Sequence, residues 1–105
     1  MNLDDLDNPL AIEIQQEKAA AYFAACRKMV DALEALKTFD RDVSPTHQRH
    51  EHATRRLALF EEAAERVYYV VIQREAMKLS GYEKFFEDYE IPDEVRKRMG
   101  PKKGK

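Results

Sequence analysis

At 105 residues the chain has the length of a single domain, and its 36% charged and 44% hydrophobic residues are typical of a folded chain rather than a disordered one. The net charge of −2 argues against general attraction to nucleic acid or to membranes. A single cysteine excludes an intrachain disulfide, and the acidic start does not look like a secretory leader.

These features predict an all-α protein of the cytoplasm. All three glycines follow Leu79, so the earlier part of the chain lacks the residue best suited to tight β-turns. The longest apolar run, Ala19 to Cys26, is far shorter than the roughly 20 residues of a membrane-spanning helix.

The first helix is predicted at about residues 8–39, because Asp7 and Asn8 are good N-caps and Pro9 suits the first helical position. Apolar residues then recur at steps of four and three, which indicates a face that packs on another helix. This face comprises Tyr22, Cys26, Met29, Leu33 and Leu36, with Phe23 and Val30 beside it. A second, alanine stripe (Ala21, Ala25, Ala32 and Ala35) is small enough for close approach of another backbone.

The second helix is predicted at about residues 45–79, after Ser44 and Pro45. Its apolar face follows the same steps, through Ala53, Leu57, Phe60, Ala64, Val67 and Val71. Residues 67–72 are β-branched and aromatic and would read as a strand in isolation, but strongly helical segments border them on both sides. We therefore expect a helix there, buried all round and covered by the C-terminal part of the chain.

Two short helices are predicted at about 81–89 and 92–99, followed by a basic tail at 100–105. Ser80 and Glu83 have the spacing of a capping box. The first short helix has an aromatic face, which we expect either to cover residues 67–72 or to form a partner-binding arm. The residues of this face are Tyr82, Phe85, Phe86 and Tyr89.

The helix lengths favour a homodimer. The two long helices would measure about 46 and 50 Å, against about 33 Å for the diameter of a compact globule of this size. A two-helix rod hides one face of each helix, yet both carry apolar residues on more than one face. We therefore expect two hairpins to pair as a four-helix bundle, unless the C-terminal arm covers the exposed face within one chain.

No motif predicts an enzyme or a cofactor. The glycine-rich phosphate loops and the Glu-x-x-His pairs of di-iron bundles do not occur. Cys26 lies on the core stripe, where a thiol is expected to be inert. His47, His50 and Glu51 fall on one arc of a helix and could hold a surface zinc ion, although nearby arginines would repel a cation.

A ligand site or a buried ion pair is a further candidate at the open end of the hairpin. With the turn placed near residue 42, Arg74 and Gln73 would lie opposite residues 11–13, and Glu13 or Glu17 would be the carboxylate partner of Arg74.

Three motifs resemble those of a small family of short bacterial proteins of unknown function. They are Q-R-E-A at residues 73–76, I-P-x-E-V at 91–95 and R-x-G at 98–100. The resemblance implies no activity, but it directs attention to the Gln73 and Arg74 end of the hairpin.

The sequence thus favours a non-enzymatic, homodimeric module that binds an unidentified protein. A bundle that binds a small ligand or metal is the alternative, and a nucleic-acid accessory protein comes third.

Overall fold

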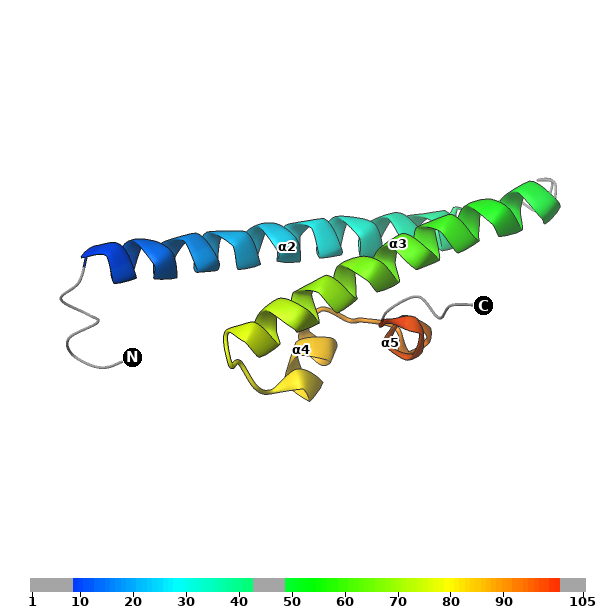
Figure 1. Cartoon of the computed structure of the whole chain (residues 1–105). Coiled ribbons are helices and arrows are strands. Elements are labelled where there is room, and N and C mark those ends of the chain that lie inside the picture. Colours follow the sequence, from blue (N-terminus) through cyan, green and yellow to red (C-terminus); the bar gives the residue numbers. More distant parts are fainter. Residues whose placement is uncertain (1–8, 43–48, 101–105) are drawn as a thin grey trace.

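The computed structural model describes residues 9–42 and 49–100. These residues form four helices and no strand, which confirms the all-α prediction (Figure 1). The helices are α2 (Pro9–Arg41), α3 (Arg49–Ala76), α4 (Tyr82–Asp88) and α5 (Asp93–Arg98). The strand-like run at 67–72 is helical, as expected, and lies within α3.

The two long helices pack against each other as an antiparallel hairpin, and the chain then folds back beneath α3 through α4 and α5 (Figure 1). The molecule measures 63 × 29 × 23 Å, and its radius of gyration of 17.7 Å exceeds the value of about 13 Å for a compact chain of this size. The elongated shape expected from the helix lengths is therefore present.

The helix ends differ from the prediction at two points. α3 ends at Ala76 rather than near Leu79, because Lys78 adopts a left-handed conformation with φ of 59°. The Leu79 and Lys78 N–H groups then donate to the carbonyls of Arg74 and Glu75, at 2.9 and 3.0 Å. This is the hydrogen-bond pattern of a Schellman motif, normally built on glycine.

The capping box expected at Ser80 and Glu83 is wrong. Gly81, with φ of 78°, precedes α4, and no side chain caps the helix. The left-handed backbone at this glycine turns the chain back toward the hairpin. The caps expected at Asp7, Asn8 and Ser44 lie outside the described residues.

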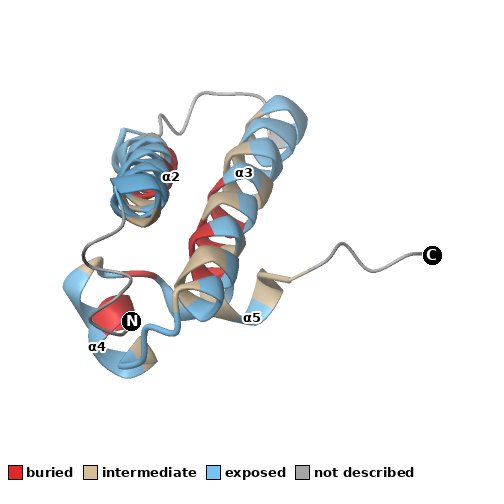
Figure 2. Ribbon diagram, turned by 60° about the vertical axis from the view of Figure 1, so that its left-hand side comes forward, coloured by how far each residue is buried: buried red, intermediate tan, exposed pale blue. Residues whose placement is uncertain are grey.

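One core joins all four helices. Met29 of α2, Val67 and Val70 of α3, and Val95 of α5 are fully buried. The predicted face of α2 is confirmed, since Cys26, Met29 and Leu36 are buried while Tyr22 and Leu33 pack partly buried against them. Figure 2 shows the buried residues along the facing sides of the helices.

Several apolar residues expected on packing faces are exposed instead. Phe23, at 63% exposure, and Val30 lie outside the core on α2, and Ala53 and Leu57 lie outside it on α3. The core is narrower than the sequence pattern suggested because each long helix contacts its neighbours through only part of its apolar surface.

Candidate interaction surface

One side of the hairpin is closed by the C-terminal arm, which we define as residues 80–99. Arg74 of α3 lies at its centre. Its Nη1 donates to the Tyr22 hydroxyl on α2 at 2.9 Å, and its Nη2 donates to the Ser80 carbonyl at 2.6 Å. The guanidinium carbon lies 4.7 Å from the centre of the Phe85 ring and 5.6 Å from that of Tyr82. Arg74 therefore ties α2, α3 and the arm together through hydrogen bonds and cation–π contacts.

The ion pair expected between Arg74 and Glu13 or Glu17 does not form. Both glutamates are exposed on α2, and the oxygen partners of Arg74 are the Tyr22 hydroxyl and the Ser80 carbonyl. The expected register was wrong by about three helical turns. The contacts of Tyr22 with Arg74 and of Asp40 with Arg56 are instead centred on position 48, about six residues later than the expected turn.

Three further arginines hold the arm in place. Arg56 of α3 makes a bidentate pair with Asp40 of α2, at 2.8 and 3.0 Å, and also contacts Glu94 of α5 at 2.8 Å. The hydrogen bond from Arg56 lowers the pKa of Asp40. Arg98 pairs with Glu61, its Nε 2.9 Å from Oε1.

Within the arm, the guanidinium carbon of Arg96 lies 4.2 Å from the centre of the Phe86 ring. The same arginine contacts Glu83 at 3.1 Å. The closed side is thus secured by arginines from both α3 and the arm.

The aromatic face of the arm, expected to be free for a partner, is turned inward. Phe85 and Phe86 are buried, and Tyr82 and Tyr89 pack partly buried against the same core. The arm therefore covers α3 within its own chain, which was the other use expected of it. This aromatic face packs into the core of its own chain and is not exposed for binding a partner.

Cys26 is buried beneath this side, close to the hydroxyls of Tyr22 and Tyr89. Burial is the main reason why the pKa of each tyrosine is raised. The thiol is enclosed between two neutral phenols and a helix, a setting that favours an inert side chain.

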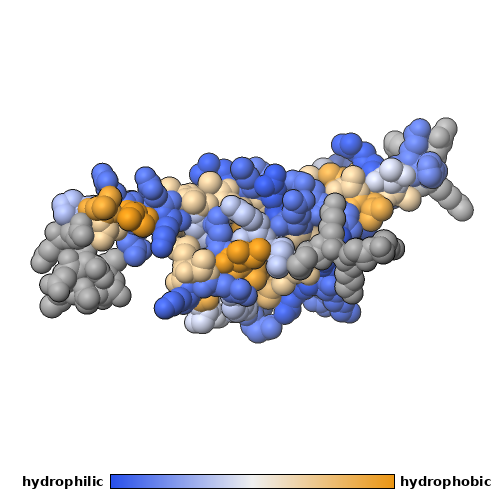
Figure 3. Space-filling view, in the orientation of Figure 1, coloured by the Kyte–Doolittle hydropathy of each residue, from blue (hydrophilic) through white to orange (hydrophobic). Residues whose placement is uncertain are grey.

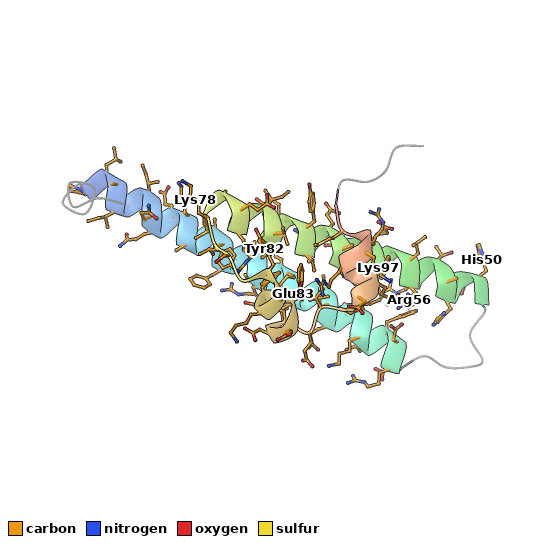
Figure 4. All side chains as sticks on the ribbon, turned by 90° about the horizontal axis from the view of Figure 1, so that it is seen from below. His50, Arg56, Lys78, Tyr82, Glu83 and Lys97 are labelled. Atoms are coloured by element: carbon orange, nitrogen blue, oxygen red, sulfur yellow. The ribbon has the colours of Figure 1, made fainter. Side chains whose placement is uncertain are left out.

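The histidine cluster is only partly described. His47 lies outside the described residues, while His50 and Glu51 are exposed at the start of α3, far from the arm (Figure 4). In the described part of the chain no group of three His, Cys, Asp or Glu side chains is placed to hold a metal ion. His52, the third histidine, stacks on Phe39 of α2, with 4.7 Å between the ring centres.

A shallow acidic cleft lies where the arm crosses α2. It has a volume of about 350 Å³, and its carboxylates are Glu34, Asp40, Glu90 and Glu94. Asp40 and Glu94 are already paired with Arg56. The cleft therefore has less free charge than its composition suggests.

The other side of the hairpin is open. A groove of about 600 Å³ runs between α2 and α3. On α2 it is lined by Ala21, Ala24, Ala25 and Lys28, and on α3 by Glu65, Arg66, Tyr68, Tyr69, Ile72 and Gln73. Tyr69 and Ile72 are exposed, at 52% and 42%. Small side chains on one wall and apolar ones on the other leave space for a further helix to approach closely.

Gln73 stands at the edge of this groove with an unsatisfied acceptor. Its Oε1 is buried and has no hydrogen-bond partner among the described residues. A buried acceptor without a donor costs roughly 1–3 kcal/mol.

The first half of α2 continues beyond the hairpin. In Figure 1 it extends past the end of α3 at the left of the view, and apart from Ala11 every residue from Pro9 to Lys18 is exposed. Leu10, Ile12 and Ile14 are among these exposed residues, at 63%, 39% and 43%. Figure 3 shows their hydrophobic surface gathered at this projecting end.

The sequence pattern identified only part of the surface formed by the open groove and the projecting end of α2. The alanine stripe of α2 was recognised from its spacing, and two of its members, Ala21 and Ala25, line the groove. Leu10 and Ile14 were not assigned to it, although they continue the same helical face toward the N-terminus. The expectation that residues 67–72 are buried all round was wrong, since only Val67, Val70 and Val71 are buried while Tyr69 and Ile72 are exposed at the groove.

No protein-family model, curated protein or solved structure matches the chain. The resemblance to a family of short bacterial proteins therefore stays a prediction. Among the described residues, no helix combines the length and apolar character needed to cross a bilayer.

Proposed function

We propose that this protein is a non-enzymatic helical interaction module that acts as a homodimer. The observation that carries the proposal is the projecting first half of α2. It displays Leu10, Ile12 and Ile14 to solvent, and along most of its length none of the described helices lies beside it.

Two physical arguments support pairing. Most helical stability in proteins comes from packing of an apolar face, and the projecting turns of α2 have no such packing against the described helices. Burying a fully exposed leucine or isoleucine contributes about 1.5–3 kcal/mol. A second copy that covers these side chains would stabilise both the projecting turns and the assembly.

Native mass spectrometry and sedimentation velocity on the full-length protein test the proposal. We expect a dimer whose population rises with protein concentration. Ile14→Glu should shift the protein to monomer without loss of helical content in the circular dichroism spectrum, because Ile14 lies outside the core. Leu79→Glu is the matched control, since Leu79 is similarly exposed, at 38%, but lies beyond the end of α3 rather than on the projecting half of α2.

A wild-type protein that stays monomeric at the highest attainable concentration would contradict the proposal. So would a dimer that Ile14→Glu and Leu79→Glu weaken equally, because the projecting half of α2 would then have no special part in pairing.

A further inference from the structure

We propose that the open groove is occupied by the middle of α2 from a second copy, so that two α2 helices run antiparallel across each other's grooves and the projecting half of each extends along the other's α2 beyond the groove. The inference rests on the proposed homodimer and specifies the surface through which it forms.

The two surfaces lie on one continuous face of α2. Residues at alternating steps of four and three follow one another from the projecting end into the groove, and we call this set the heptad stripe. Its members are Leu10, Ile14, Glu17, Ala21, Ala24, Lys28, Asp31 and Ala35. All are exposed, and the spacing is that of a helix–helix contact. The half with the bulky Leu10 and Ile14 projects, and Ala21, Ala24 and Lys28 of the other half line the groove.

Size complementarity favours the antiparallel arrangement. Placing the twofold axis between Ala21 and Ala24 sets Ala21 of one copy against Ala24 of the other. Two alanines at the centre allow the helix axes to approach closely. Leu10 of each copy then lies opposite Ala35 of the other, a large side chain against a small one, while Ile14 lies opposite Asp31.

Charge complementarity fixes the same register. Glu17 and Lys28 are the members of the heptad stripe that flank the two alanines, and in this pairing Glu17 of one copy lies opposite Lys28 of the other. Within one chain, neither side chain has an ion-pair partner among the described residues. The twofold symmetry makes each contact occur twice.

The walls of the groove suit this occupant. Tyr69 and Ile72 of α3 stand beside the alanines and would cover the flank of the incoming helix around its own Ala21 and Ala24. The contact is isologous, because each copy supplies one projecting helix and one groove, so it closes as a dimer rather than extending into a fibre.

Charge reversal tests the register. The dissociation constant of the dimer is measured by sedimentation equilibrium for the wild type, Glu17→Lys, Lys28→Glu and the double variant. Each single variant should raise the constant by roughly tenfold or more, because two attractive contacts become repulsive. The double variant should return to within about threefold of the wild type.

Arg27→Glu is the matched control. It makes the same change of charge one position from Lys28, on an exposed part of α2 outside the heptad stripe, and should change the constant by less than about threefold. Glu17, Arg27 and Lys28 are all exposed, and circular dichroism should confirm that each variant retains its fold.

The outcomes separate the two proposals. A monomeric wild type overturns the homodimer and this pairing with it. A wild-type dimer that is insensitive to both single variants, or whose double variant is not rescued, leaves the homodimer standing and overturns the antiparallel α2 pairing.

Discussion

The closed and the open sides of the hairpin flank the same buried stripe of α2, but different groups cover the two sides. On the closed side, Tyr22 and Asp40 meet arginines of α3, and the arm adds Phe85 and Phe86 to the core. On the open side, α2 offers alanines and α3 offers the exposed Tyr69 and Ile72. One side is completed by the chain itself, and the other has the features of a surface completed by another molecule.

The difference lies in side-chain size as much as in hydrophobicity. Large aromatic residues fill the space on the closed side, where short helices can be held at the distance that bulky side chains require. Alanines on the open side leave room for a helix backbone at close range. The closed side is suited to packing against bulky aromatic side chains, and the open side is suited to packing against a helix backbone. This difference explains how one protein can have both a closed core and an open groove.

The largest expected difference between the two sides is in monomer stability. Phe85→Ala should lower the free energy of unfolding by about 3–5 kcal/mol, because Phe85 is buried and removal of its ring leaves a cavity and takes away a cation–π contact with Arg74. Tyr69→Ala, on the open side, should lower it by less than about 1 kcal/mol. Urea unfolding at a protein concentration well below the dimer dissociation constant measures both.

Similar losses for the two variants would contradict the comparison, because the open side would then contribute to the monomer as much as the closed side does. Repeating the measurement at high protein concentration sharpens it. There, Tyr69→Ala should lose additional stability through weaker pairing.

The second prediction concerns the link between the hairpin and the arm. Arg74→Met retains much of the side-chain length but removes the donors to Tyr22 and Ser80, and should cost about 2 kcal/mol in the free energy of unfolding. Arg74→Lys should recover only part of this, since one ammonium group does not reproduce the planar guanidinium. Denaturant melts of the three proteins give the values.

A double-mutant cycle with Tyr22→Phe isolates one of these contacts. A coupling of about 1 kcal/mol is expected if the hydrogen bond to the Tyr22 hydroxyl contributes as its 2.9 Å length indicates. A coupling near zero would assign the stability of the closed side to the aromatic contacts instead.

The fold was largely predictable from local patterns. The helical steps through Tyr22, Cys26 and Met29 identified the packed face of α2, and the acids and bases at opposite ends of α5 marked that short helix. These signals depend on residues close together in the sequence. They hold whatever the tertiary arrangement. They also predicted that the C-terminal arm covers residues 67–72, which is right for the buried valines of that run but wrong for the exposed Tyr69 and Ile72.

The candidate sites were less predictable, because they depend on register. An error of about three turns in the hairpin was enough to give Arg74 the wrong partners, since each turn of helix replaces the opposing residues by a new set. The end of α3 was also missed. Lys78 takes a left-handed conformation usually filled by glycine, and nothing in its identity signals the turn.

The smallest expected effect belongs to the edge of the closed side, where Arg56 joins Asp40 and Glu94. Both carboxylates are substantially exposed, at 44% and 51%, so Asp40→Asn should lower the free energy of unfolding by only about 0.5 kcal/mol at neutral pH and low salt.

Because the hydrogen bond from Arg56 lowers the pKa of Asp40 below its ordinary value of 3.8, ionised Asp40 stabilises the folded state above that value. This contribution is lost as the pH falls through the lowered pKa, where the variant and the wild type should become equally stable. Thermal melts across the acidic range measure the difference. A difference in stability between the variant and the wild type that persists at the lowest pH would show that Asp40 contributes by packing rather than by charge. The edge of the closed side would then resemble the buried centre around Phe85.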